Sequence, residues 1–562
     1  MTPPDSAGLH SHAFRRSWAV WFTLLVLALV AGVRIALMNF PLERDEGEYA
    51  YAGQLLLQGI PPYQLAYNMK FPGTYAAYAV IMWLFGETPA GIHFGVMVAT
   101  TLTSLMLYRL GRRILDPVTG MVAATTYAVL ATESGMFGMA GHATHFAALF
   151  ATAGGCALWR ARPRADWLWA GIAGAMFGVA VLMKQHAVFL GAWALLVLAW
   201  DCRGGGEVSR RRRVLNFAAA GVGLALPIGI CGLWLWHANV FGKFWFWTVD
   251  YARRYVEIKP FSSSWRALKF SLRQIMLRED YLLWALVVAG AGLIWLEERL
   301  RPARLWLLGF AAAGLMTTVP GFYFRTHYFL LALPAAALLA AGAVAGLRRL
   351  WNKLIGPGRF QNWPVVVLYA ALLALTLWQN RGVWSLFARA EGREPFQAHL
   401  FYGPEPFPEA AAVADFIRAH SDPEARIAVL GSEPEIYFLA HRHSATGYIY
   451  TYALMEAQPF ARQMQAEMIR EIETNTPEFI VYTSAVSSWL PTPGSKPDIF
   501  DWWADYKTNY TRVGVADILW PSETRFAWGE SAASYGALKG EGFEVYRRNE
   551  RPDAANAGWR TK

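Results

Sequence analysis

The sequence predicts an α-helical polytopic membrane protein with about eleven transmembrane helices and a C-terminal extracytoplasmic α/β domain. Of its 562 residues, 55% are hydrophobic and only 16% are charged, whereas a soluble protein carries about a quarter charged residues. Aromatic residues make up 15% of the chain, and Trp and Tyr favour membrane–water interfaces. These values exclude a disordered chain, a coiled coil and an ordinary cytosolic enzyme.

Eleven apolar runs are each interpreted as a membrane-spanning helix. The first covers residues 18–40 and directly follows Arg15 and Arg16. We expect it to be a span, because it is longer than the apolar core of a signal peptide and about 20 helical residues cross a bilayer. The other runs cover residues 90–108, 119–132, 143–159, 167–182, 187–200, 214–236, 281–296, 305–321, 327–346 and 363–380.

The distribution of arginine predicts the orientation of these spans. Every second loop is rich in arginine, starting with the pair before the first run, whereas the opposite short loops hold almost no Lys or Arg. Lys and Arg concentrate in cytoplasmic loops. We therefore expect a multi-pass protein of the inner (plasma) membrane with a cytoplasmic N-terminus. Because the number of spans is odd, the C-terminal domain is expected outside the cytoplasm.

Two parts of the chain differ in composition. Residues 1–399 have a net charge of +17 and contain all eleven runs, with long outer loops at about 41–89 and 237–280. Both loops contain helix-like segments with aromatic faces, which we expect along the membrane surface. Residues 400–562 have a net charge of −7 and a normal polar composition. Since the cations of the first part lie between apolar runs, the bilayer explains them better than a nucleic acid does.

The tail predicts an α/β domain with a partly parallel sheet, because helix and strand signals alternate along it. Ser432 and Glu435 have the spacing of a helix capping box. The tail has no GxGxxG or GxxxxGK[ST] motif, so nucleotide binding is unsupported. The expected helices cover 408–420, 432–442 and 456–475, and the expected strands cover 425–431, 478–484 and 543–548.

A group of carboxylates follows the first span at its outer end: Glu43, Asp45, Glu46 and Glu48. If a helix begins near Arg44, Asp45 and Glu48 share one face at i,i+3, and Glu46 points elsewhere. Carboxylates near acyl chains are costly and are retained when they have a task, which favours Asp45 as a general base or a metal ligand. The alternative is a solvated acidic helix start that the helix dipole favours.

Three cations lie on the side opposite the arginine-rich loops: Lys70, Lys184 and Arg325, the last followed closely by His327. Each of them alone is explained by an interfacial anchor whose charge reaches the headgroups. The orientation of the spans does not explain the three together, whereas an outward-facing anionic ligand such as a lipid phosphate does.

His142 and His145 stand at i,i+3 at the outer start of the fourth span. Together with Asp45 they could bind a divalent metal, or they could be a structural pair on one helix face. No other cofactor is indicated. The three cysteines offer neither a CxxC motif nor a disulfide framework.

Four segments resemble the polytopic C-type glycosyltransferases of the dolichyl-phosphate-mannose–protein mannosyltransferase-like family, which includes bacterial aminoarabinose and galacturonic-acid transferases. They are RDEGEY after the first span, KFPG in the first outer loop, GVAVLMKQHAVFL and FRTHYFLLALP. The resemblance covers roughly residues 18–400, and the tail looks like the extracytoplasmic domain of some bacterial members. It implies the C-type glycosyltransferase fold and transfer of a sugar, with inversion, from a polyprenyl-phosphate donor to a lipid, glycan or protein acceptor.

The resemblance also implies roles for individual residues. Asp45 matches the family's first-loop aspartate, which acts as base toward the acceptor or as its electrostatic partner, and Glu46 matches its acidic neighbour. Lys70 matches a lysine thought to hold the donor phosphate, and Arg325 and His327 fall where some members place further phosphate contacts. Lys184 joins this group as a third outward cation.

One stretch departs from the family pattern. Many members have a second carboxylate near the start of the fourth span, where this chain reads GMAGHATHFAALF and the nearest acid is Glu133. Either His142 and His145 take over that role, with Glu48 as a further candidate for contact with the acceptor or a metal, or the acceptor or metal dependence differs.

Two other functions remain open at this point. A transporter or flippase for an anionic polyprenyl-linked lipid would also need many spans and outward cations, but it usually has ionisable groups near the midplane. Here Arg34 is the only charge well inside an apolar run. The third alternative is a membrane-anchored sensor or scaffold whose tail binds a ligand.

Overall fold

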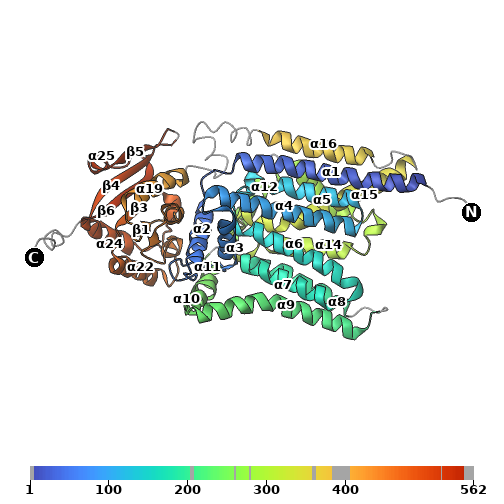
Figure 1. The fold of residues 1–562 in the computed structure, drawn as a ribbon, viewed down its shortest axis with the longest axis horizontal. Helices are drawn as coiled ribbons and strands as arrows, with labels where there is room; N and C mark the ends of the chain where they lie inside the picture. The colour runs from blue at the N-terminus through green and yellow to red at the C-terminus, as the bar shows by residue number, and fades with distance from the viewer. Residues whose placement is uncertain are drawn as a thin grey trace, which may run out of the picture.

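The computed structural model describes residues 6–202, 208–258, 261–277, 280–356, 363–381, 405–520 and 522–549. A long helical body is followed by an α/β part that stands at one end of it (Figure 1). The predicted boundary at residue 400 falls among residues 382–404, outside the described residues.

Each predicted apolar run is helical in the structure. Helices such as α1, α4, α7 and α9 run nearly parallel along the body (Figure 1). These helices are α1 (Ser6–Ala36), α4 (Pro89–Ile114), α5 (Pro117–Leu130), α6 (Ala143–Ala161), α7 (Trp167–Met183), α8 (Val188–Asp201), α9 (Arg210–His237), α13 (Tyr281–Leu293), α14 (Arg304–Met316), α15 (Leu333–Ile355) and α16 (Trp363–Gln379).

The lengths of these helices fit a polytopic membrane protein. Within the described ranges, four helical segments are long and apolar enough to cross a membrane by themselves: Trp18–Ala36, Pro89–Ile114, Arg210–His237 and Thr326–Ile355. Seven further apolar helices of the described residues have 10–17 residues; one of them, Gly73–Phe85, lies in the first long loop and was not among the predicted spans. The predicted class, a polytopic helical protein with a small C-terminal sheet domain, is confirmed.

Close packing of the body depends on small residues. In α7, a Cβ atom added at Gly174 would collide with the Ala220 carbonyl of α9, and one at Gly178 would lie 2.6 Å from the ring of Pro227. Small residues at such contacts let helix backbones approach each other closely within a membrane.

The two long loops that the sequence predicts to be extracytoplasmic contain short helices that are not part of the parallel bundle. The first loop forms α2 (Arg44–Leu57) and α3 (Gly73–Phe85), and α2 lies across the end of the body that faces the α/β part (Figure 1). The second loop forms α10 (Phe241–Trp245), the π-helical segment η4 (Phe246–Tyr251), α11 (Ala252–Glu257) and α12 (Phe261–Met276). On α12, Trp265 and Phe270 are exposed, as expected for a helix at a membrane surface.

The α/β part is built on a six-stranded sheet with strand order β2-β1-β3-β6-β4-β5. Strand β1 (Arg426–Leu430) pairs in parallel with β2 (His443–Ser444) and with β3 (Phe479–Thr483). Strand β6 (Glu541–Arg548) pairs antiparallel with β3 and with β4 (Tyr510–Ile518), and β5 (Arg525–Trp528) pairs antiparallel with β4. The sheet is thus partly parallel, as predicted.

Helices surround this sheet, and four short 3₁₀ segments belong to the helical body. The helices are α19 (Phe407–His420), α20 (Glu435–Ala440), α21 (Tyr452–Met455), α22 (Ala461–Asn475), α23 (Val486–Trp489), α24 (Asp498–Tyr506) and α25 (Glu530–Ala533). The 3₁₀ segments are η1 (Ser134–Met136), η3 (Gln185–Ala187), η6 (Pro320–Phe322) and η7 (Thr326–Ala332).

Two details of the tail were wrong. The helix expected from residue 432 begins only at Glu435 with Pro434 as its N-cap, because the Ser432 hydroxyl bonds to Thr451 instead of capping a helix. The helix expected from residue 456 begins at Ala461. Strands β2, β4 and β5 were not predicted from the sequence.

Candidate active site

Helix α2 positions the predicted acidic residues because its N-terminus is tightly capped. The helix begins at Arg44, as the sequence suggested, and Glu43 is its N-cap. The Glu43 side chain accepts a hydrogen bond from the Glu46 amide, and the Glu46 side chain accepts one from the Glu43 amide. This reciprocal capping box satisfies two otherwise free amides and fixes the first turn, which contains Asp45.

Asp45 and Glu48 lie on the same face of α2 and share one cation. The Lys70 Nζ atom lies 2.7 Å from Asp45 Oδ1 and 2.5 Å from Glu48 Oε2. The Glu48 carboxylate also accepts a hydrogen bond from the Tyr75 hydroxyl at 2.7 Å. The same ammonium stands 4.5 Å from the centre of the Tyr49 ring. Lys70, predicted to hold a phosphate, is therefore already paired with two carboxylates.

The pairing determines the charges of Asp45 and Lys70. Burial opposes ionisation of Asp45, but the charge of Lys70 and its hydrogen bond outweigh burial and hold the pKa of Asp45 well below its ordinary value. Burial likewise opposes the charge on Lys70, but Asp45 and Glu48 raise the pKa of Lys70 well above its ordinary value. Both groups are charged at neutral pH, so Asp45 is present as an anion.

Two other predicted cations, Lys184 and Arg325, lie close to this group without a carboxylate partner. Within the described ranges, neither of them forms an ion pair. The Lys184 Nζ atom stands 4.8 Å from the centre of the Tyr328 ring, and Arg325, Asp45 and Lys70 also act electrostatically on Tyr328. Arg325 is exposed and lies 5.8 Å from the ring centre of Tyr323.

The environment of Lys184 is electropositive. Burial, followed by the charge of Lys70, lowers the pKa of Lys184 to about 8, and Arg325 contributes in the same direction. An anionic ligand would relieve this repulsion, since a charge–charge interaction is far stronger at a buried site than in water. The arrangement is thus suited to an anion.

His142 and His327 lie together beside Asp45. The two rings are stacked with centres 4.3 Å apart and an interplanar angle of 12°, and His142 Nδ1 lies 3.8 Å from Asp45 Oδ2. One oxygen of Asp45 and one ring nitrogen of each histidine lie within 4.8 Å of one another. His327 was predicted to contact phosphate, whereas the structure places it in this three-residue group.

These three residues fit a divalent metal. Burial lowers the pKa of His142 to about 4, so its ring is neutral at physiological pH, as a metal ligand must be. In the described part of the chain neither ring nitrogen of His142 has a hydrogen-bond partner. One carboxylate and two imidazoles form the three-ligand set with an open position that catalytic zinc sites use.

Two predicted residues lie apart from this group. The Glu46 carboxylate is fully buried and accepts hydrogen bonds from the Gly141 amide and at 3.1 Å from the His93 ring, besides its part in the capping box. His145 is buried in the first turn of α6 and is not one of the clustered metal-binding candidates.

The tail contributes to this region, which was not predicted from the sequence. The Tyr450 hydroxyl donates a hydrogen bond to Asp45 Oδ1 at 3.0 Å, and Tyr452 interacts electrostatically with Arg325. Glu456 also faces Arg325, and burial raises the pKa of Glu456 to about 7. The only signal in the sequence was the alternation of tyrosines at positions 448, 450 and 452. Below, "the Asp45 cluster" means Asp45, Glu48, Lys70, His142, Lys184, Arg325, His327, Tyr328 and Tyr450.

The chain is similar to known proteins in one segment of its sequence and in its fold. Residues 70–230 match the family model described as dolichyl-phosphate-mannose-protein mannosyltransferase. No curated protein gives a significant sequence match. Among solved structures, ArnT from Cupriavidus metallidurans bound to undecaprenyl phosphate is 17% identical, with a TM-score of 0.56, over 82% of this chain and 93% of that one.

Two further structures agree with this likeness. ArnT from the same organism in the apo state is 15% identical, with a TM-score of 0.55, over 94% of this chain and 98% of that one. The oligosaccharyltransferase AglB from Archaeoglobus fulgidus, in complex with an inhibitory peptide and a dolichol-phosphate, is 12% identical, with a TM-score of 0.51, over 92% of this chain and 75% of that one. The chain therefore has the fold of the polytopic C-type glycosyltransferases, and the resemblance to the dolichyl-phosphate-mannose–protein mannosyltransferase-like family is confirmed.

Proposed function

We propose that this protein is an integral-membrane, inverting glycosyltransferase of the inner membrane that moves a sugar from a polyprenyl-phosphate donor to an acceptor hydroxyl on the extracytoplasmic face. The observation that carries the proposal is the charge pattern of the Asp45 cluster. The ionised carboxylate of Asp45 and the cation Arg325 both act electrostatically on Lys184, and neither Lys184 nor Arg325 has a carboxylate partner in the described part of the chain.

Asp45 is proposed to accept the proton of the acceptor. Its Oδ1 atom is occupied by Lys70 and Tyr450, which leaves Oδ2 for the substrate. As the acceptor oxygen forms its bond to the anomeric carbon, its proton passes to Oδ2 and the bond from that carbon to the phosphate oxygen breaks. A positioned base of this kind accelerates a reaction typically by about 10²–10⁴-fold.

Lys184 and Arg325 are proposed to bind the phosphate. The electron pair of the broken bond stays on the phosphate oxygen, so negative charge grows on the leaving polyprenyl phosphate. Cations that are already in place where this charge develops stabilise the transition state without reorganisation. Lys70 is proposed to act mainly through Asp45, whose ionised form it stabilises.

Asp45, His142 and His327 would hold a divalent metal, with Glu48 joined to them only through Lys70. When bound, such a metal would act as a Lewis acid on an oxygen of the reactants. Glu46 is proposed to hold the start of α2 in place through its contacts with Gly141 and His93, and His145 is proposed to be structural.

The experiment reconstitutes the purified protein in liposomes with a panel of undecaprenyl-phosphate-linked sugars and measures the release of undecaprenyl phosphate. We expect release with at least one donor. Asp45→Asn, which is nearly isosteric, should abolish release while membrane insertion and the melting temperature remain close to those of the wild type.

Two results would refute the proposal. One is full activity of the Asp45→Asn variant. The other is movement of the lipid across the bilayer without any release of undecaprenyl phosphate, which is the behaviour of the rival flippase.

A further inference from the structure

We infer that the C-terminal α/β domain completes the active site and that Tyr450 is a positioning residue, which fixes the orientation of the Asp45 carboxylate. The inference rests on the proposed function, because it assigns a role to Tyr450 through Asp45. If Tyr450 has this role, the rate of sugar transfer depends on how the C-terminal domain docks on α2.

The contact between the two residues is direct. The Tyr450 hydroxyl donates to Asp45 Oδ1 at 3.0 Å, and the Lys70 ammonium donates to the same oxygen at 2.7 Å. Lys70 also stands 5.5 Å from the centre of the Tyr450 ring. Two donors on Oδ1 hold the carboxylate in one rotational state, so that Oδ2 faces the side of His142.

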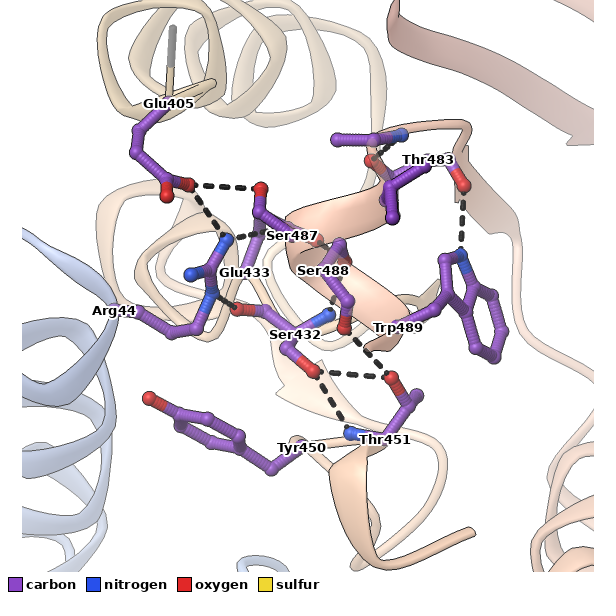
Figure 2. A network of polar contacts seen from close by, with 12 residues as sticks. Arg44, Glu405, Ser432, Glu433, Tyr450, Thr451, Thr483, Ser487, Ser488 and Trp489 are labelled. Atoms are coloured by element: carbon purple, nitrogen blue, oxygen red, sulfur yellow. Dashed lines mark hydrogen bonds and ion pairs between the residues drawn. The ribbon is translucent and has the colours of Figure 1, made fainter. Parts of the chain in front are cut away.

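A second contact anchors the same turn of α2 to the tail. Arg44, the residue before Asp45, donates through Nε to the Ser432 carbonyl at 2.6 Å (Figure 2). Its Nη2 atom lies 3.1 Å from Glu405 Oε2 and 3.1 Å from Glu433 Oε1. Arg44 is only 8% exposed. Charge-assisted hydrogen bonds of this kind are among the strongest that side chains make.

The anchor continues to the residue next to Tyr450. The Thr451 amide donates to the Ser432 hydroxyl at 2.9 Å, and the Thr451 hydroxyl donates to the Ser488 carbonyl at 3.0 Å (Figure 2). Ser488 in turn donates to Glu433 Oε2 at 2.7 Å. Thr451 is fully buried, so the backbone directly after Tyr450 is held by hydrogen bonds of both the amide and the side chain of Thr451.

The two contacts form a closed circuit. It runs from Arg44 through Ser432 and Thr451 to Tyr450, and from Tyr450 to Asp45, the neighbour of Arg44. These contacts fix the position of the tail relative to the first turn of α2. This turn contains Asp45, which is proposed to accept the proton. Buried polar networks in which every member is bonded favour a single arrangement.

The test uses Tyr450→Phe, which removes one hydroxyl and keeps the ring. The matched control is Tyr448→Phe, since the Tyr448 hydroxyl also bonds a carboxylate, Glu467 Oε2 at 2.7 Å, but does not touch the Asp45 cluster. We expect Tyr450→Phe to lower kcat by about 10-fold or more, as for loss of a hydrogen bond to a charged group, with an unchanged KM for the donor. Tyr448→Phe should leave kcat as in the wild type.

A second measurement does not need transfer activity. Melting temperatures of the wild type, Tyr450→Phe, Asp45→Ala and the double variant in detergent form a double-mutant cycle. We expect Tyr450→Phe to lower the melting temperature in the wild-type background and to have no further effect beside Asp45→Ala.

These outcomes separate the inference from the proposed function. Equal effects of Tyr450→Phe in both backgrounds overturn the contact, even in a preparation that transfers no sugar. In a preparation that does transfer sugar, an unchanged kcat of Tyr450→Phe, or an equal loss in Tyr448→Phe, overturns the positioning role. If the wild type releases no polyprenyl phosphate from any donor, the proposed function fails, and the thermal cycle alone decides whether Tyr450 holds Asp45.

Discussion

The ammonium group of Lys70 lies 2.7 Å from Oδ1 of Asp45, although 25 residues separate the two in the chain. The same ammonium lies 2.5 Å from Glu48 Oε2, so one cation holds two carboxylates that would otherwise repel each other. This ion-paired group, and not a free lysine, is what the first outer loop contributes to the Asp45 cluster.

The pairing predicts how Lys70 affects kinetics. Lys70→Ala should lower kcat by about 10²-fold, because two adjacent carboxylates without a cation cannot both remain ionised. KM for the donor should change little, since Lys184 and Arg325 remain. Steady-state kinetics with the donor identified from the panel check this. A large rise in KM at constant kcat would instead show that Lys70 binds the phosphate itself.

Lys184 gives a prediction for pH. Its pKa is lowered to about 8, so the free protein loses this charge between about pH 7 and pH 9, whereas a bound phosphate favours the protonated form. Affinity for undecaprenyl phosphate should therefore fall as the pH rises through 8. Equilibrium binding of undecaprenyl phosphate at a series of pH values measures this.

Two variants of Lys184 test whether its charge causes the pH dependence of the affinity for undecaprenyl phosphate. Lys184→Arg keeps its charge over this range and should bind with little dependence on pH. Lys184→Ala should bind about 10-fold or more weakly at pH 7 and also without the pH dependence. A pH dependence that persists in Lys184→Ala would assign the titration to another group.

The histidine pair predicts metal binding. His142→Ala and His327→Ala should each weaken binding of Zn²⁺, because each removes one of only three ligands. Isothermal titration calorimetry of the protein with Zn²⁺ measures the affinity, and chelator treatment should release the same metal. His441→Ala, a partly exposed histidine of the tail, is the control and should bind as the wild type does. Equal affinity in all four proteins would exclude the site.

The sequence predicted those features that local signals determine. Hydropathy alone located the eleven predicted apolar runs, each of which contains a helix in the described part of the chain, because each signal extends over more than ten residues. The cations Lys184 and Arg325 stood out because their side of the membrane contradicts the positive-inside rule. A helix start near Arg44 was the condition under which Asp45 and Glu48 share one face, and α2 begins there.

The features that were not predicted from the sequence depend on contacts between segments that are far apart in the chain. Tyr450 and Asp45 are 405 residues apart, and Arg44 and Glu433 are 389 apart, so no local pattern links them. Glu46 matches a family position, yet its carboxylate is bonded to the amides of Glu43 and Gly141 and to the His93 ring, and two of these partners are distant in the sequence. The Ser432–Glu435 spacing predicted a capping box, and the hydroxyl of Ser432 found Thr451 instead.

Close approach of α2 to the tail predicts a sensitive glycine. A Cβ atom at Gly47 would lie 2.6 Å from the Glu435 amide nitrogen and 2.8 Å from its Cα, and backbone cannot yield as a flexible side chain does. Gly47→Ala should therefore lower the melting temperature and weaken docking of the tail on α2, despite the higher helix propensity of alanine. Limited proteolysis together with thermal unfolding measures both.

The control for this substitution is Gly32→Ala. Gly32 lies in α1, and a Cβ atom there would meet nothing within 4 Å, so alanine should be neutral or slightly stabilising. Equal melting temperatures of the Gly47→Ala variant and the wild type would contradict the tight contact.

The last prediction concerns two neighbouring glutamates at this junction, both fully buried. Glu433 is paired with Arg44 at 3.1 Å, whereas neither carboxylate oxygen of Glu435 has a hydrogen-bond partner in the described part of the chain. Burial, together with the charge of Glu433, raises the pKa of Glu435 well above its ordinary value of 4.5.

A carboxyl group whose pKa is raised on folding stabilises the folded state fully only below its unfolded pKa, and this contribution is lost as the pH rises through the folded pKa. Glu435→Gln removes that dependence. The melting temperature of Glu435→Gln relative to the wild type should therefore increase steadily from pH 5 to pH 8. Glu433→Gln should lower the melting temperature at all these pH values, because it leaves Arg44 buried without its full charge partner. If the two substitutions shift the melting temperature in parallel across this range, Glu435 is not the group whose ionisation opposes docking.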